Sequence, residues 1–386
     1  MRVLAVLLAA CNAPHAVAPD APPVVADAAA PDARAIDTSP LEITSLGVQG
    51  FVLRRGHDVV MTAPLFTRQS ELDVTLNVPI TSDTQAIDTH LTGVPLDELR
   101  AIVSGHAHYD HLLDVPHILA AAPAAVALTN LTGRHVLAAL APDRDASCTS
   151  APANPALDRA RVIAMDDPFA NHVDYTNCPD QLPPGGSPQA TWLALAPHVR
   201  AIAVCSMHPA QIAGIYHFGA GSIDSDQCDV PAAAAGWLEG QTLAYLIDFL
   251  DDSGRPAFRI YYQDAPANAP LGQVPAALLA DKPVDVALLC VGSYDAVTND
   301  PQTVIASLAP RFAISGHWED FFQPVDSPPQ PIPLLDVPTY VSRAEAALPP
   351  PGDAPLLVDG VATDHRHVLA QPGMHVAVPL ALSSTR

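Results

Sequence analysis

Four residues that commonly bind metal ions are concentrated in one short segment, Gly105-His106-Ala107-His108-Tyr109-Asp110-His111. In an extended chain, His106 and His108 point to the same side because side chains alternate along the backbone. Asp110 and His111 follow where the chain is expected to turn into a helix, and this turn directs their side chains toward a second point nearby. The segment therefore predicts two ligands for each of two metal ions.

The elements around this segment alternate between strands and helices. A buried strand is expected at 100–104, directly before the histidines, and short antiparallel strands are expected earlier, followed by a polar loop over 67–91 and later by an irregular region over 141–197. The other expected strands are 42–47, 50–53, 58–61, 124–128, 199–205, 243–247, 257–262, 284–290 and 311–315, and the expected helices are 112–121, 131–140, 274–279 and 302–308. This order favours an α/β layered sandwich.

The pattern HxHxDH at the end of a strand resembles the signature of the metallo-β-lactamase superfamily, and the resemblance extends from about residue 43 to at least residue 322. It implies an α/β fold, a four-layer αββα sandwich of the metallo-β-lactamase type. It also implies three more ligands at later strand ends, namely His208, Asp264 and His317. His217, close behind His208, is the alternative for the first of these.

The resemblance also implies how the ligands divide. His106, His108 and His208 would hold one metal, while Asp110, His111 and His317 would hold the other, with Asp264 between the two. This donor set suits two Zn²⁺ ions, and Fe or Mn is possible. Two such ions can lower the pKa of a shared water and supply hydroxide for hydrolysis. Asp110 and Asp264 are then the catalytic candidates that position the water.

Other positions near the ligands are open to more than one interpretation. Tyr109 and His217 are candidate proton donors or packing residues, and the run 318–320 either lines the pocket or begins a helix. The sequence departs from the family at Gln263, where Gly is common, and at Ala63, where an Asp often supports the ligand loop. Its absence puts the rigidity of that loop in doubt rather than metal binding. No GxSxG motif indicates a serine nucleophile.

Composition limits the partners. The 386 residues include 41 acidic and 18 basic ones, giving a net charge of −23. Without clusters of Lys and Arg the chain is not expected to bind nucleic acid or to dock electrostatically on anionic lipids. A small-molecule ester or phosphodiester substrate is the expected partner.

The N-terminus resembles an export signal. Arg2 precedes an apolar run, and Leu8-Ala9-Ala10-Cys11 is similar to the bacterial lipobox, in which the cysteine is lipidated. Three regions are therefore expected: a lipoprotein-type signal peptide over 1–11, a disordered tether rich in Ala, Pro and Asp over 12–39, and a metallo-β-lactamase-like hydrolase domain over 40–386. The expected location is the bacterial cell envelope, exported or held by a lipid anchor, with no other membrane contact.

The remaining cysteines fall into two groups. Cys148, Cys178 and Cys228 lie in loops and are candidates for one disulfide, which an exported protein permits. Cys205 and Cys290 lie in apolar runs and are interpreted as buried small side chains.

The sequence predicts a binuclear metal hydrolase that uses a metal-bound hydroxide to cleave a small ester, lactone or phosphodiester bond. Two alternatives remain: a di-iron redox protein on the same fold, and a non-catalytic metal-binding module of the envelope. A redox member of this kind usually carries a flavin-binding domain, and none is evident here. Structural metal sites are usually rich in cysteine, whereas this donor set is rich in His and Asp.

Overall fold

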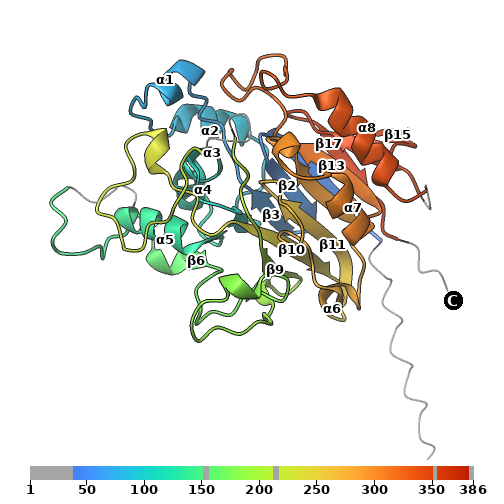
Figure 1. Ribbon diagram of the computed structural model, residues 1–386, viewed down its shortest axis with the longest axis horizontal. Helices are drawn as coiled ribbons and strands as arrows, with labels where there is room; N and C mark the ends of the chain where they lie inside the picture. Colours follow the sequence, from blue (N-terminus) through green and yellow to red (C-terminus); the bar gives the residue numbers. More distant parts are fainter. Residues whose placement is uncertain (1–37, 151–155, 212–216, 351–353, 382–386) are drawn as a thin grey trace, which may run out of the picture. The chain divides into compact units, whose positions relative to one another are not determined.

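The computed structural model describes residues 38–150, 156–211, 217–350 and 354–381 (Figure 1). The signal peptide predicted over 1–11 and nearly all of the tether predicted over 12–39 lie outside these residues. In the described ranges, none of the helices combines the length and the apolar composition that a membrane-spanning helix requires.

The first sheet has nine strands in the order β15-β14-β17-β1-β2-β3-β4-β5-β6. Its strands are β1 (Leu41–Gly47), β2 (Gly50–Arg55), β3 (Asp58–Thr62), β4 (Leu99–Val103), β5 (Val126–Thr129), β6 (Val162–Ala164), β14 (Leu356–Val358), β15 (Val361–Thr363) and β17 (His375–Val378). The expected antiparallel start is confirmed, since β1 pairs with β2 and β2 pairs with β3 in antiparallel register. From β3 to β6 the neighbours are parallel.

The second sheet has eight strands, with β16-β13-β12-β11-β10-β9-β7 in order and β8 paired to β9. Its strands are β7 (Val173–Asp174), β8 (Leu193–Ala196), β9 (Val199–Cys205), β10 (Leu243–Leu250), β11 (Pro256–Gln263), β12 (Val286–Cys290), β13 (Phe312–Gly316) and β16 (His367–Leu369). Strand β10 is antiparallel to both β9 and β11, and β11, β12 and β13 are parallel. The carboxyl ends of β9, β11 and β13 therefore meet at one edge of this sheet.

The helices are short. They are α1 (Glu71–Thr75), α2 (Thr84–His90), α3 (Tyr109–Leu112), α4 (Val115–Ala121), α5 (Leu131–Leu137), α6 (Ala276–Leu279), α7 (Gln302–Leu308) and α8 (Val337–Ala347). Local sequence explains several of their starts, because Ser70, Asp83, Asn130 and Asp336 each cap a helix N-terminus with a side-chain oxygen.

Three apolar cores define four layers. One core lies between the sheets and joins, for example, Phe51 and Leu53 of the first sheet to Tyr245 and Phe258 of the second. A second core packs the outer face of the first sheet against α2 to α5, and a third packs the outer face of the second sheet against α7 and α8 (Figure 1). The predicted four-layer αββα sandwich is confirmed.

Several boundaries differ from the sequence predictions. The expected polar loop over 67–91 contains α1 and α2, and the helix expected over 112–121 is divided into α3 and α4. Asp114 lies at this division, where its carboxylate accepts hydrogen bonds from the backbone of Phe66 and Thr67 at 2.7 and 2.8 Å. Strands β14 to β17 and helix α8 were not anticipated, although β17 pairs with β1 and β16 extends the second sheet.

Candidate metal centre

The HxHxDH segment links the end of β4 to α3, as expected. Both of its ends are fixed: Ser104 N donates to Leu128 O at 2.9 Å, and Ser104 Oγ donates to the carbonyl of His111 at 3.0 Å. Tyr245, from the facing sheet, donates its hydroxyl to Ser104 O at 3.1 Å. The loop that carries four of the predicted ligands is therefore held by both sheets.

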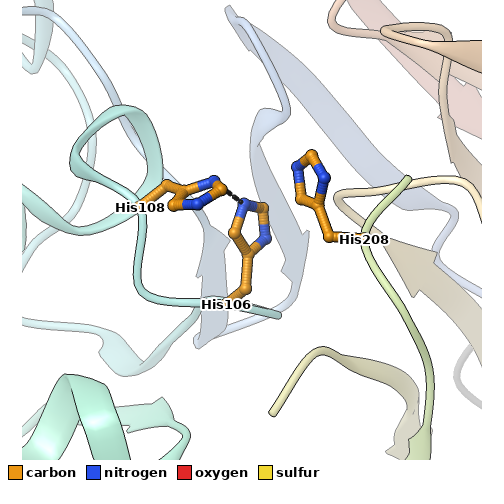
Figure 2. A group of neighbouring side chains, drawn as sticks. All are labelled: His106, His108 and His208. Atoms are coloured by element: carbon orange, nitrogen blue, oxygen red, sulfur yellow. Dashed lines mark hydrogen bonds between the residues drawn. The ribbon is translucent and has the colours of Figure 1, made fainter. Parts of the chain in front are cut away.

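The structure brings His106, His108 and His208 together (Figure 2). One candidate donor atom from each residue lies within 4.8 Å of the other two. The ring centroid of His208, which follows β9, is 4.7 Å from that of His106 and 4.9 Å from that of His108. This is the first predicted ligand triad, assembled from two loops at the same edge of the sandwich.

The hydrogen bonds of this triad fit ligands of a cation. Burial lowers the pKa of His108 to about 4, so its ring is neutral near pH 7. Its Nε2 lies 3.3 Å from the carbonyl of Gly219, which accepts only, and the proton therefore belongs on Nε2. Asp264 Oδ1 lies 2.9 Å from His106 Nδ1 and accepts a hydrogen bond, so the proton of His106 belongs on Nδ1.

The consequence is that His106 Nε2 and His108 Nδ1 face each other at 2.9 Å, each with a lone pair (Figure 2). Two lone pairs at this distance repel unless a positive centre lies close to both. A metal ion bound by both nitrogens provides that centre. The donor set therefore fits a metal ion at this point.

The second predicted triad, Asp110, His111 and His317, is also assembled. Asp110 Oδ2 lies 3.3 Å from the Nε2 atoms of both His111 and His317. Among the described residues, neither ring nitrogen of His111 nor Nδ1 of His317 has an aligned hydrogen-bond partner, although all three atoms are buried. Buried donors without partners are uncommon, and metal coordination accounts for them.

Asp264 lies between the two triads, directly after β11. Its Oδ1 contacts His106 Nδ1, and its Oδ2 accepts from Gly105 N at 2.5 Å and lies 3.8 Å from His111 Nδ1. It thus contacts one member of each predicted triad. Burial raises the pKa of Asp264, although the neighbouring His111 lowers it.

Gly105 makes the approach of Asp264 possible. A Cβ atom at this position would lie 2.2 Å from Asp264 Oδ1 and 2.6 Å from Leu243 O. Any larger residue would push the Asp264 carboxylate away from the histidines. The glycine before the first histidine therefore serves the close packing of two ligand-bearing segments.

His317 sits on a strained turn after β13. Its φ is +57°, in the left-handed region, and its N–H donates to Val48 O at 2.5 Å. The carboxylate of Glu319 accepts from Val48 N and lies 3.7 Å from Arg68, with both charged side chains buried. The β1–β2 turn and this ion pair therefore fix the loop that presents His317.

The two triads differ in the charge that their side chains carry. Burial lowers the pKa of His106 and of His208, which keeps both imidazoles neutral and able to bind a cation. In the second triad burial raises the pKa of Asp110, but His111 and His317 outweigh it and hold that pKa well below its usual value. The Asp110 carboxylate is therefore ionised.

The residues next to the candidate ligands have mainly structural contacts. Tyr109 is buried in the outer apolar core, and burial raises the pKa of its hydroxyl, which favours packing over proton donation. Trp318 is buried and donates its indole N–H to Ala370 O at 2.5 Å. Glu319 pairs with Arg68, so Trp318 and Glu319 support the loop. The alternative of a helix start over 318–320 is wrong, because no helix begins there.

Two other details concern the ligand loops. Ala63 stands where the family that the sequence resembles often has Asp. It packs in the core between the sheets, and its N–H donates to Val103 O at 2.9 Å. The backbone carbonyl of Gln263 accepts a hydrogen bond from Gln49 Nε2 at 2.8 Å. Both departures are thus accommodated by packing and backbone hydrogen bonds close to the ligands.

The interpretation of Cys205 was wrong, because Cys205 forms a disulfide with Cys178. Cys148 forms a second one with Cys228, and Cys290 is buried and free, as expected. An apolar strand residue can meet a loop cysteine from a distant segment, and this pairing leaves no mark in the local pattern. The Cys178–Cys205 bond ties the end of β9, just before His208, to the irregular region.

A further pair near the centre was only partly anticipated. His217 Nε2 lies 2.6 Å from Glu239 Oε2, and the rings of His217 and His208 have centroids 5.4 Å apart. His217 appeared in the sequence analysis as a competitor of His208, but Glu239 did not. No motif marks it, since it lies in a loop with no other ligand.

No family model matches the chain, and no curated protein matches it. Among solved structures it is similar to Igni18, a metallo hydrolase from the archaeon Ignicoccus hospitalis, at 13% identity over 89% of this chain and 100% of that chain, with a TM-score of 0.45. It is also similar to YhfI from Bacillus subtilis, a metallo-β-lactamase fold protein, at 10% identity over 87% and 98%, with a TM-score of 0.44.

A third similar structure is CmlA from Streptomyces venezuelae, a diiron β-hydroxylase, at 11% identity over 89% of this chain and 54% of that chain, with a TM-score of 0.40. These identities and TM-scores are low. The function proposed below therefore rests on the geometry of the donor cluster.

Proposed function

We propose that this protein is a metal-dependent hydrolase with a binuclear centre. The observation that supports it most is the convergence of seven His and Asp side chains from four strand ends, in two triads whose donor atoms lie within 4.8 Å of one another, with Asp264 in contact with both. A structural metal site is usually mononuclear and closed by cysteines, whereas this set is suited to catalysis.

In this proposal His106, His108 and His208 hold one ion, and Asp110, His111 and His317 hold the other. When bound, two such ions acidify water and polarise the bond that is to be cleaved. Asp264 keeps the His106 ring oriented by accepting from its Nδ1 at 2.9 Å. Asp110 and Asp264 are the carboxylates available to orient a water molecule at the centre.

The proposed substrate is a small ester, lactone or phosphodiester with an apolar part. Asp110 and His317 have side chains that are 11% and 10% exposed. Phe321 packs edge-on against His317 with centroids 5.2 Å apart, and Phe322 lies 4.6 Å from Phe321. These half-buried aromatic rings offer an apolar contact beside the proposed reaction site.

Zn²⁺ is the proposed metal because borderline imidazole nitrogens dominate the donor set. Iron or manganese would satisfy the same ligands, and a di-iron centre would favour redox chemistry instead. Elemental analysis separates these cases. An iron centre would in addition give a visible absorption band.

We propose further that the protein is exported and lipid-anchored through Cys11. The lipobox-like segment ending at Cys11 is the main support. The disulfides Cys148–Cys228 and Cys178–Cys205 fit an oxidising compartment. Mass spectrometry of the protein from membranes would reveal a diacylated Cys11, and an unmodified N-terminus would contradict the anchor.

The test of hydrolysis combines metal analysis with turnover of bis-p-nitrophenyl phosphate, a p-nitrophenyl ester and a simple lactone. We expect about two metal ions per chain and turnover of at least one substrate. His106→Ala should abolish turnover because it breaks a ligand triad, while His375→Ala, which removes a histidine paired with Glu42, should leave turnover unchanged. A fully metal-loaded protein that is inactive on all three substrates would favour the non-catalytic module.

A further inference from the structure

A third group of potential metal ligands lies on the solvent side of His208. It consists of His208, His217 and Glu239, with one candidate donor atom from each within 4.8 Å of the other two. All three residues are half-buried, and the side chains of His217 and Glu239 are 29% and 16% exposed. This group is therefore partly exposed to solvent, whereas His106 is fully buried.

The backbone positions this group firmly against the ligand loop. Glu239 O accepts from Ala107 N at 3.0 Å, and Glu239 N donates to Gly219 O at 2.8 Å. Asn130 Nδ2 also donates to Glu239 O, at 2.6 Å. The segments that carry His217 and Glu239 are thus hydrogen-bonded to the HxH loop and to the N-terminus of α5.

The donor atoms of the group are free to bind a cation. His208 Nδ1 donates to the carbonyl of Pro209 at 2.7 Å, which leaves a lone pair on Nε2. His217 Nε2 and Glu239 Oε2 are buried atoms that lie 2.6 Å apart but have no aligned hydrogen bond among the described residues. Two imidazoles and one carboxylate with an open side are a ligand set that zinc uses in catalytic sites.

We propose that His208, His217 and Glu239 form a second position for a divalent transition-metal ion, an outer site that takes Zn²⁺ or Co²⁺. The outer site and the triad of His106, His108 and His208 use the same Nε2 of His208. An ion in one therefore excludes an ion in the other. His208 becomes a ligand shared between a buried position and a solvent-facing one.

This inference depends on the three side chains and not on the hydrolysis proposed above, so its test counts metal ions. Zinc per chain is measured by mass spectrometry after equilibration with excess Zn²⁺ and removal of free ions. In His108→Ala the buried triad is broken, and we expect the outer site to keep the total at about two ions per chain. Adding His217→Ala or Glu239→Gln should lower the total to about one.

The matched control is His108→Ala with His375→Ala. His375 also lies beside a glutamate, with its Nε2 2.9 Å from Glu42 Oε2, but among the described residues no third candidate ligand is grouped with them. This double variant should keep the zinc content of His108→Ala. If His108→Ala does not fold, as judged by near-ultraviolet circular dichroism, His108→Asn replaces it in every variant.

Anomalous diffraction at the zinc edge then locates the ion. A peak in bonding range of His217 and Glu239 in the His108 variant is expected. Equal zinc contents with and without His217→Ala, or a peak elsewhere, would overturn the outer site. Either result leaves the hydrolase proposal untouched, because that proposal is tested by turnover of the unmodified protein.

Discussion

The ion pair between Arg68 and Glu319 supports the loop of His317 at a high cost in desolvation. Both side chains are almost fully buried, at 5% and 6% exposure, and their charged atoms lie 3.7 Å apart. Burial lowers the pKa of Arg68 and raises that of Glu319, even though each partner opposes the shift. Desolvation therefore outweighs the attraction between the two charges.

This balance predicts an asymmetric response to substitution. Glu319→Gln leaves the buried Arg68 charge without its ion-pair partner, and because Arg cannot release its proton, the loss should be about 3–5 kcal/mol of unfolding free energy. Arg68→Met should cost less, since the buried Glu319 can take up a proton. The double variant should recover about 2 kcal/mol relative to Glu319→Gln. A loss of this size is a large part of the roughly 5–15 kcal/mol that stabilises most proteins.

Urea unfolding followed by circular dichroism measures these values, with the disulfides intact. The control is Asp167→Asn, which breaks a partly exposed pair with Arg134 at 2.9 Å and should cost about 0–1 kcal/mol. Zinc affinity should fall in Glu319→Gln, because Glu319 holds the turn that fixes His317. Additive losses in the double variant, or a loss below about 1 kcal/mol for Glu319→Gln, would refute the reasoning.

Three further predictions concern the centre and its frame. His106→Ala and Asp264→Ala should each abolish turnover, because each removes a side chain of the binuclear centre; unchanged turnover in both would contradict the assignment. Gly105→Ala should lower stability by about 1–3 kcal/mol in urea and weaken zinc binding, because its Cβ would lie 2.2 Å from Asp264 Oδ1, and wild-type values would show that the carboxylate is free to move. Replacing Cys148 and Cys228 by Ser should cost about 4 kcal/mol in the same assay, since the bond closes a loop across a separation of 80 residues; no loss would show that the unfolded loop is already restricted.

The sequence located the strand ends that carry the candidate ligands, because a buried strand with a strong apolar pattern precedes each of them. Apolar runs before His106, His208 and His317 form β4, β9 and β13, and strands of this kind have a strong apolar signal. The order of the ligands was inferred from the family resemblance, because their spacing alone could not supply it. The structure adds their convergence at one edge of the sandwich.

Features that depend on contacts between distant residues were not predictable. Cys205 was interpreted as an apolar packing residue because its bond to Cys178 leaves no local signal. Glu239 lies in a loop, and only the fold brings it to His217. The strands β14 to β17 are only three or four residues long, and they form by pairing with strands already in place rather than by strong local preference.

Two metal ions are proposed to occupy the two triads at the ends of these strands. Anomalous diffraction from crystals of the metal-loaded protein, recorded at the zinc and iron edges, tests this proposal most directly. We predict two peaks, one bonded to His106, His108 and His208 and the other to Asp110, His111 and His317. A map in which neither triad holds a metal, with zinc in excess, would contradict the account.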